Sequence, residues 1–213
     1  MRRSSLLVIV SVAILLATEV QAQVVAEVFA TARQASHEVW WNKPLSDSSR
    51  FSFFNYTRFR VNYADQRQNS LFSYSTVNFN LGRGFGLAAG GYITPSGFKP
   101  VAALSYYYQN NTWLVNLFPS LELTRNPNAD MFVFVQYRPR LTARTRLFTQ
   151  LIANSNFNLR RHNFSEQALR LGLDYRSFQF GLGTDLSQLP ATGFEKKSTQ
   201  FWAAWGLFIR REF

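Results

Sequence analysis

The sequence predicts an all-β protein: a closed antiparallel transmembrane β-barrel of about ten strands, with a short N-terminal helical segment before it. Three observations lead to this fold class. The chain begins with an export signal, its later part alternates apolar and polar residues, and the connections between the alternating segments are long and short in turn. Most of these segments have close to the ~9–11 residues with which a tilted strand crosses a bilayer.

The N-terminus has the three parts of a secretory signal peptide. Arg2 and Arg3 supply the positive region, residues 6–17 form the apolar region, and Val20 and Ala22 precede the expected cleavage point. The apolar region is shorter than the ~20 residues of a membrane-spanning helix. We therefore expect residues 1–22 to be a signal peptide that is removed on export.

Residues 23–50 have a different pattern from the rest of the chain. Apolar residues recur there at near-helical spacing: Val24, Val25, Val28, Phe29, Ala32, Ala35 and Val39. This spacing predicts a short helix over about residues 24–36, in the periplasm or at the barrel mouth, with Trp40 and Trp41 as an interfacial anchor. Residues 45–50 are expected to form a linker.

The barrel is predicted over residues 51–213, where the period of the pattern becomes two. The expected strands are 51–63, 71–81, 85–93, 99–109, 112–123, 130–138, 142–153, 167–176, 178–186 and 199–213. The longer connections are 64–70, 94–98, 124–129, 154–166 and 187–198, and the shorter ones are 82–84, 110–111, 139–141 and 177. Outer-membrane barrels have longer extracellular loops and short periplasmic turns, so this alternation predicts that both barrel ends of the chain are periplasmic.

The two faces of these strands differ in charge. One face is apolar and, in the strands as drawn, its one charged residue is Arg211. The other face is expected to line the lumen with Arg58, Arg60, Glu122, Arg144, Arg146, Arg170, Asp174, Asp185 and Arg210. A charge that faces lipid at the bilayer centre costs about 2–4 kcal/mol, which explains the segregation.

Three local features follow from this register. We expect Asp174 to bridge Arg144 or Arg146, with Arg176 flanking, because these residues face inward at similar depth on neighbouring strands. Pro119 is expected to cause a bulge or kink. A bulge is also expected in the second predicted strand, where polar Ser73 and Ser75 fall on the apolar face.

The last segment, residues 201–213, resembles the C-terminal strand of bacterial outer-membrane β-barrel proteins. Those proteins end in an aromatic residue preceded by alternating apolar residues, as Trp205, Leu207, Ile209 and Phe213 do here, whereas Arg211 departs from the pattern. The resemblance implies location in the bacterial outer membrane, contact with its lipid and lipopolysaccharide, and recognition of this strand by the barrel-assembly machinery.

Composition limits the chemistry that the chain can perform. There is no cysteine, so neither a disulfide nor a thiolate metal site can form, and no His, Asp and Glu spacing matches a metal-ligand set. We expect no metal and no cofactor. The net charge is +11, but the export signal argues against nucleic acid as the partner. Anionic lipid headgroups or an anionic solute are the better candidates.

Three functions remain open on the sequence. The inward arginines favour an integral outer-membrane protein that is either structural, with ion pairs plugging the lumen, or a narrow pore for small anionic solutes. An alternative is an enzyme at the extracellular rim that uses His162, near which Ser155, Ser165 and Glu166 lie in sequence. A further alternative is surface binding through residues 154–166 and 187–198. The oligomeric state is not predicted.

Overall fold

The computed structural model describes residues 23–95, 97–158, 162–189 and 200–213, so the expected signal peptide (residues 1–22) lies outside the described part. Twelve strands close into one barrel: β1 (Gln23–Thr31), β2 (Gln34–Pro44), β3 (Phe51–Asn62), β4 (Ser70–Gly82), β5 (Phe85–Thr94), β6 (Gly97–Gln109), β7 (Trp113–Glu122), β8 (Ala129–Tyr137), β9 (Thr145–Phe157), β10 (His162–Tyr175), β11 (Phe178–Leu189) and β12 (Gln200–Glu212). The one helical element among the described residues is a 3-10 turn, η1 (Gln66–Gln68). In these residues no helix is both long and apolar enough to cross a membrane.

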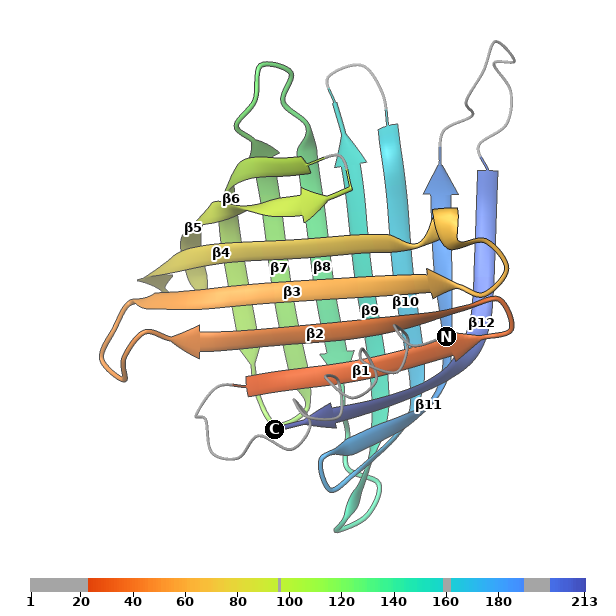
Figure 1. The fold of residues 1–213 in the computed structure, drawn as a ribbon. Coiled ribbons are helices and arrows are strands. Elements are labelled where there is room, and N and C mark those ends of the chain that lie inside the picture. Colours follow the sequence, from red (N-terminus) through yellow and green to blue (C-terminus); the bar gives the residue numbers. More distant parts are fainter. Residues whose placement is uncertain (1–22, 96, 159–161, 190–199) are drawn as a thin grey trace.

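Every strand pairs antiparallel with its sequence neighbours, and β1 pairs with β12 to close the ring. Figure 1 shows β1 to β4 in front, crossing steeply over β7 to β10 behind them. The start of β1 and the end of β12 lie at the same end of the barrel, because Val25 is opposite Glu212. We call this end the terminal end and the opposite one the distal end.

The prediction of a helix in residues 23–50 is wrong, because this segment forms β1 and β2. Both faces of β1 carry apolar residues: Val25 and Phe29 are buried in the lumen on either side of Glu27, and Val24 and Val28 alternate with them on the outer face. Because apolar residues occur on both faces, the strand shows no clear period of two, and its apolar positions fit helical spacing as well. Trp40 consequently points into the lumen rather than anchoring a helix, while Trp41 lies on the outer face against Phe53.

The turn between β1 and β2 carries none of the usual turn residues. Thr31 Oγ1 accepts hydrogen bonds from the backbone N–H groups of Arg33 and Gln34, at 3.2 and 3.0 Å. A threonine side chain thus replaces the glycine or asparagine that commonly marks a hairpin. This is why the sequence pattern missed the hairpin.

The strand count is therefore twelve rather than about ten, and the expected alternation of loop lengths does not hold. At the distal end the connections 32–33 and 95–96 have two residues each, whereas at the terminal end 45–50 and 138–144 have six and seven. Residues 154–166 are mostly strand, because β9 extends to Phe157 and β10 begins at His162. The first and the last strand still begin and finish at the same end of the barrel, as predicted. That this end is periplasmic stays a prediction.

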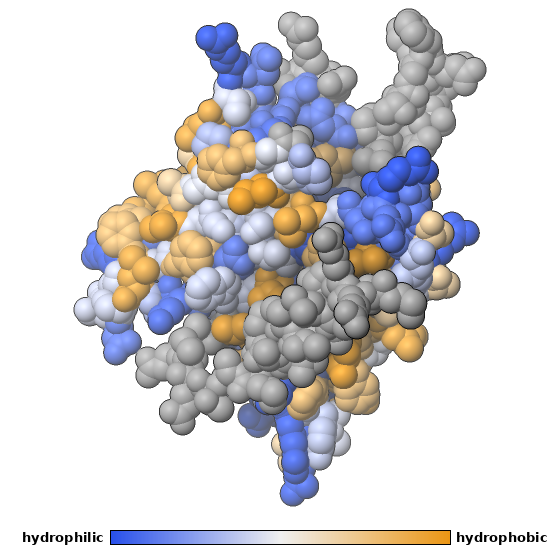
Figure 2. All heavy atoms as spheres, in the orientation of Figure 1, coloured by the Kyte–Doolittle hydropathy of each residue, from blue (hydrophilic) through white to orange (hydrophobic). Residues whose placement is uncertain are grey.

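The outer face is apolar along most strands, as predicted. Large exposed side chains on it include Phe85, Leu104, Leu171, Leu182, Trp205 and Leu207. Figure 2 shows apolar residues across the middle of this view and hydrophilic residues gathered towards its top and bottom. Such a distribution matches a barrel whose middle is covered by lipid.

Neither expected irregularity is a bulge at the residues named, although the β4–β5 ladder does shift register between Asn80 and Gly82, at the far end of β4. Neighbouring registers are continuous at Ser73 and Ser75, whose hydroxyls instead join a polar cluster with Asn55 and Thr57 on the outer face. Asn55 donates to the Ser75 hydroxyl at 2.9 Å, and the Thr57 and Ser73 hydroxyls are 2.8 Å apart. At Pro119 the β6–β7 ladder skips two residue pairs and resumes in the same register. The missing N–H of proline interrupts the ladder without shifting it.

Candidate functional site: the barrel lumen

The lumen is crossed in its middle by aromatic side chains from opposite walls. Trp40 of β2 packs edge-on against Phe134 of β8 at a centroid distance of 4.4 Å, although five strands separate β2 from β8 on either side. Nearby, Phe54 stacks on Phe118 at 5.8 Å. Side chains from opposite walls thus meet across the ring at this depth.

An ion-pair network fills the lumen between β2, β3, β10 and β11. Arg58 Nε is 2.8 Å from Glu38, its Nη1 is 3.2 Å from Glu166, and its Nη2 is 3.5 Å from Asp185. Arg60 approaches Glu166 and Asp185 at 3.8 and 3.9 Å. Buried charges need such partners, because an isolated ion in a low-dielectric interior is costly.

Arg170 extends this network and is completely buried. Its Nε is 2.7 Å from Glu27 Oε1, and its Nη1 is 2.9 Å from Asp185 Oδ1. The guanidinium carbon lies 3.9 Å from the centre of the Phe29 ring. Gly183 leaves room for this arrangement, because a Cβ there would lie 2.7 Å from Arg170 Cδ.

Arg210 holds a second buried position nearer the terminal end. Its guanidinium carbon lies 4.6 Å from the Trp40 ring and 5.2 Å from the Phe148 ring. It also donates hydrogen bonds to Gln150 and, at 3.0 Å, to Glu212. Aromatic faces, an amide oxygen and a carboxylate thus surround this cation.

Six of the nine expected lumen residues come to lie in the buried interior: Arg58, Arg60, Glu122, Arg170, Asp185 and Arg210. The other three are at the terminal end, where Arg144 belongs to the exposed β8–β9 turn, and Arg146 and Asp174 sit at strand ends. Two further buried acids, Glu27 and Glu38, were not expected in the lumen, because residues 23–50 were predicted to form a helix and a linker.

The expected bridge from Asp174 to Arg144 or Arg146 is wrong. Asp174 is opposite Arg146 in the register, but its ion pair is with Arg138, at 3.6 Å. Arg146 turns away and donates to the carbonyl of Asn111 at 2.9 Å. Arg138 ended the predicted strand 130–138 but was not counted among the lumen residues, and residues 142–144, predicted to begin the next strand, belong to the β8–β9 turn.

Cavities lie on both sides of the aromatic crossing. The distal cavity has a volume of about 250 Å³ and the terminal cavity about 300 Å³. Phe54 lines both of them, and Phe118 lines the distal cavity and stacks on Phe54. This pair therefore forms the partition between the two cavities.

His162 lies at the first residue of β10 and meets Ser165 but not the expected acid. Its Nε2 is 2.8 Å from Ser165 Oγ, which is 2.7 Å from Ser155 Oγ. Glu166 faces the opposite way, into the lumen, where it is held by Arg58. A nucleophile and a base are in contact, whereas the acid that would orient the base is on the other side of the sheet.

The C-terminal strand closes the barrel through its pairing with β1. Trp205, Leu207 and Ile209 are exposed on its outer face, and the Phe213 N–H donates to the Val24 carbonyl at 2.9 Å. Arg211 lies against the Phe213 ring, with the guanidinium carbon 4.6 Å from its centre. Recognition of this strand by an assembly machinery stays a prediction.

The described residues contain no group of three or more His, Asp and Glu side chains that could hold a metal ion. No protein-family model and no curated protein matches the chain.

Solved structures show what the fold resembles. The chain is similar to the NanC porin, at 10% identity over 90% of this chain and 100% of that one, with a TM-score of 0.50. This is a porin-like outer-membrane β-barrel fold. OmpT, an outer membrane protein of Vibrio cholerae, is a more distant match, at 8% identity over 90% and 96% of the two chains, with a TM-score of 0.39. A mutant of the Rh. blastica porin matches at 8% identity over 91% and 99%, with a TM-score of 0.32.

The porin-like barrel is located in the outer membrane. It is closed, so no strand edge remains to be hydrogen-bonded inside lipid, and its outer face is apolar at the middle while its ion pairs lie on the inside. The class resemblance of the last strand is thereby confirmed at the level of the fold.

Proposed function

We propose that this chain is an integral outer-membrane barrel with a structural role, whose lumen is closed to solutes by its own side chains. The observation that carries the proposal is the partition of Phe54 and Phe118, which lies between the distal and terminal cavities. Both side chains are almost fully buried. A hydrated ion cannot pass two stacked rings at this separation unless they move.

The charges inside the barrel also disfavour a pore for small anions. The central network has three arginines, Arg58, Arg60 and Arg170, and four carboxylates, Glu27, Glu38, Glu166 and Asp185. The excess of inward arginine that suggested anion preference is offset by the acids of β1 and β2. Selectivity for anions requires uncompensated cationic groups along the path.

Single-channel recording in a planar bilayer tests this proposal. We expect no conductance from the unmodified protein, and measurable conductance from the double variant Phe54→Ala/Phe118→Ala, because it removes the partition. Phe85→Ala is the matched control, since this side chain is exposed on the outer face. Steady conductance of the unmodified protein, or a silent double variant that is folded, contradicts the proposal.

The contact between His162 and Ser165 favours a second candidate, hydrolysis of an acyl group at the distal rim. The 2.8 Å distance is the one expected of a nucleophile and its base. The buried position of Ser165 and the absence of an acid beside His162 in the described residues weigh against it. Loss of a lipid-hydrolysing activity in Ser165→Ala, with the activity retained in Ser155→Ala, would support this candidate.

A further inference from the structure

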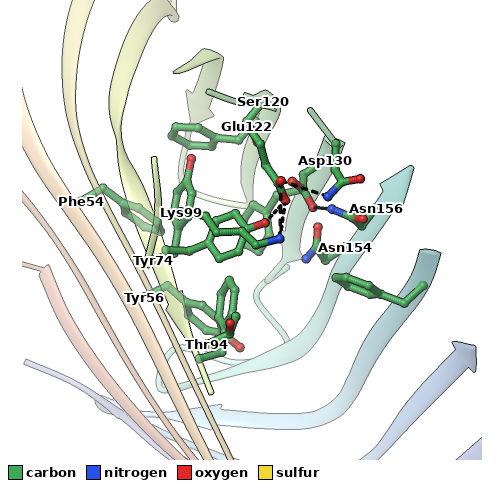
Figure 3. Close-up of a pocket in the computed structure, with 16 residues that line it drawn as sticks. Phe54, Tyr56, Tyr74, Thr94, Lys99, Ser120, Glu122, Asp130, Asn154 and Asn156 are labelled. Carbon is green, nitrogen blue, oxygen red and sulfur yellow. Dashed lines mark hydrogen bonds and ion pairs between the residues drawn. The ribbon is translucent and has the colours of Figure 1, made fainter. Parts of the chain in front are cut away.

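We propose that the distal cavity binds a small primary organic ammonium ion with an apolar body. The cavity has a volume of about 250 Å³ and is built from side chains of β3 to β10 (Figure 3). It is smaller than the ~300–1,000 Å³ typical of pockets for drug-sized ligands. The fitting ligand is therefore compact. This binding site is independent of whether the barrel conducts.

Aromatic rings form most of the wall. They belong to Phe54, Tyr56, Phe72, Tyr74, Tyr92, Phe118, Phe132 and Phe164. Ring pairs within this wall have centroids about 6 Å apart, with Phe72 and Tyr92 at 5.9 Å and Tyr56 and Phe132 at 6.2 Å. The faces of such rings attract cations, and their carbon surface removes an apolar body from water.

The charges of the cavity leave room for one further positive charge. Of its two carboxylates, Glu122 is fully engaged: it accepts hydrogen bonds from the Tyr92 hydroxyl, from Asn128 at 2.9 Å and from Lys99 at 3.3 Å. Asp130 has no ion pair among the described residues. Lys99 thus balances Glu122, and the negative charge of Asp130 remains uncompensated.

Asp130 also has a free acceptor atom. Its Oδ1 accepts from Asn156 Nδ2 at 2.6 Å, whereas its Oδ2 is buried and has no hydrogen-bond partner in the protein. Figure 3 shows Asp130, Asn156 and Asn154 together on the side of the cavity that faces Lys99. A buried acceptor without a donor costs about 1–3 kcal/mol.

Two other oxygens on the cavity wall, Asn154 Oδ1 and the Tyr74 hydroxyl, are also buried without a hydrogen-bond partner in the protein. A primary ammonium has three N–H donors and one positive charge. It therefore supplies what these acceptors and Asp130 lack. A neutral alcohol provides no charge, a carboxylate or phosphate would be repelled, and a quaternary ammonium has no N–H to donate.

A metal ion is a poorer fit than an organic cation. No group of three or more His, Asp and Glu side chains that could hold a metal ion occurs in the described parts of the chain. Of the two carboxylates on the cavity wall, Glu122 is already engaged, so Asp130 alone remains for a hard cation that requires several oxygen ligands. The apolar wall instead favours a ligand with a hydrocarbon body.

Titration calorimetry of the purified full-length protein in detergent micelles tests the site. The probe is 2-phenylethylammonium, compared with 2-phenylethanol, which has the same body without the charge, and with its N,N,N-trimethyl analogue, which has the charge without N–H groups. We expect 2-phenylethylammonium to bind at least about tenfold more tightly than either, as charge-assisted hydrogen bonds in a buried site imply.

Variants locate the binding in the cavity. Asp130→Asn keeps the shape and removes the charge, and we expect it to weaken 2-phenylethylammonium binding at least about tenfold. Asp65→Asn is the matched control, because Asp65 is a distal-end carboxylate before η1 and lies outside the cavity. We expect its affinity to be unchanged. Tyr74→Phe, which loses one acceptor, should weaken binding several-fold and serves if Asp130→Asn does not fold.

Three results would overturn the proposal. The first is no binding of 2-phenylethylammonium to the unmodified protein, and the second is that 2-phenylethanol or the trimethyl analogue binds as tightly as 2-phenylethylammonium. The third is that folded Asp130→Asn and Tyr74→Phe both bind 2-phenylethylammonium with the affinity of the unmodified protein. None of these readouts involves conductance. Failure of the ligand site is thus distinguishable from failure of the closed-lumen proposal.

Discussion

Arg170→Met is the substitution that most directly tests what holds the lumen together. The arginine side chain is fully buried, and Arg170 is the one described ion-pair partner of Glu27. Glu27 Oε2 has no hydrogen-bond partner even with Arg170 present. The variant would therefore leave a buried carboxylate with neither of its oxygens satisfied.

The expected loss follows from counting the partners that remain. Asp185 keeps Arg58 at 3.5 Å and Arg60 at 3.9 Å, so its environment changes less. A buried carboxylate left without its ion-pair partner, here Glu27, should lower the free energy of unfolding by about 3–5 kcal/mol. The double variant Glu27→Gln/Arg170→Met removes that charge and should recover a large part of the loss.

Urea unfolding in lipid vesicles, followed by tryptophan fluorescence, measures this difference. Arg67→Met is the control: it also breaks an arginine–carboxylate pair, but the Arg67 side chain is 90% exposed, and we expect no measurable change. The reasoning fails if Arg170→Met is as stable as Arg67→Met. It also fails if the double variant is no more stable than Arg170→Met.

Three further outcomes are expected. Gly183→Val should destabilise the barrel in the same urea assay, because its side chain would occupy the space of Arg170; unchanged stability would show that the position is not crowded. Asp174→Ala should cost no more than about 1 kcal/mol, since its ion pair with Arg138 is long and Arg138 keeps its closer pair with Glu212 at 2.7 Å, and a larger loss would mean that the pair with Asp174 is more strongly coupled. Removal of Phe213 should lower the yield of membrane-inserted barrel in cells while isolated, refolded protein keeps its stability, which a gel-shift assay of heated and unheated samples would separate.

The sequence was sufficient for the fold class from β3 to β12, because in most of those strands the charged residues lie on one face only. It was insufficient for β1, where Val25 and Phe29 point into a lumen that accepts apolar side chains as well as charges. Alternation identifies a strand only when the two faces meet different solvents, and inside a filled barrel they need not. The hairpin formed by Thr31 gave no glycine or proline signal to correct the error.

The candidate site was less predictable than the fold. Arg58 and Arg170 were predicted correctly to face the lumen. Their partners Glu38 and Glu27 lie on β2 and β1, which were not predicted as strands. The distal cavity could not be found from sequence at all. Its aromatic residues come from separate strands, and each one taken singly is only an inward-facing residue of its own strand. Only the closure of the ring and its register bring them together.

The pairing of β1 with β12 joins the first strand to be made with the last. The bond from Arg170 to Glu27 spans the same gap, since these residues are 143 positions apart in the chain. Arg170 is on β10, so it comes beside Glu27 only when β12 has closed the ring onto β1. An unfinished sheet that entered the hydrocarbon would therefore carry an unpaired carboxylate into it. Ring closure and neutralisation of this charge are therefore one event. A truncated chain is at a disadvantage in lipid for an electrostatic reason, in addition to its unpaired strand edges.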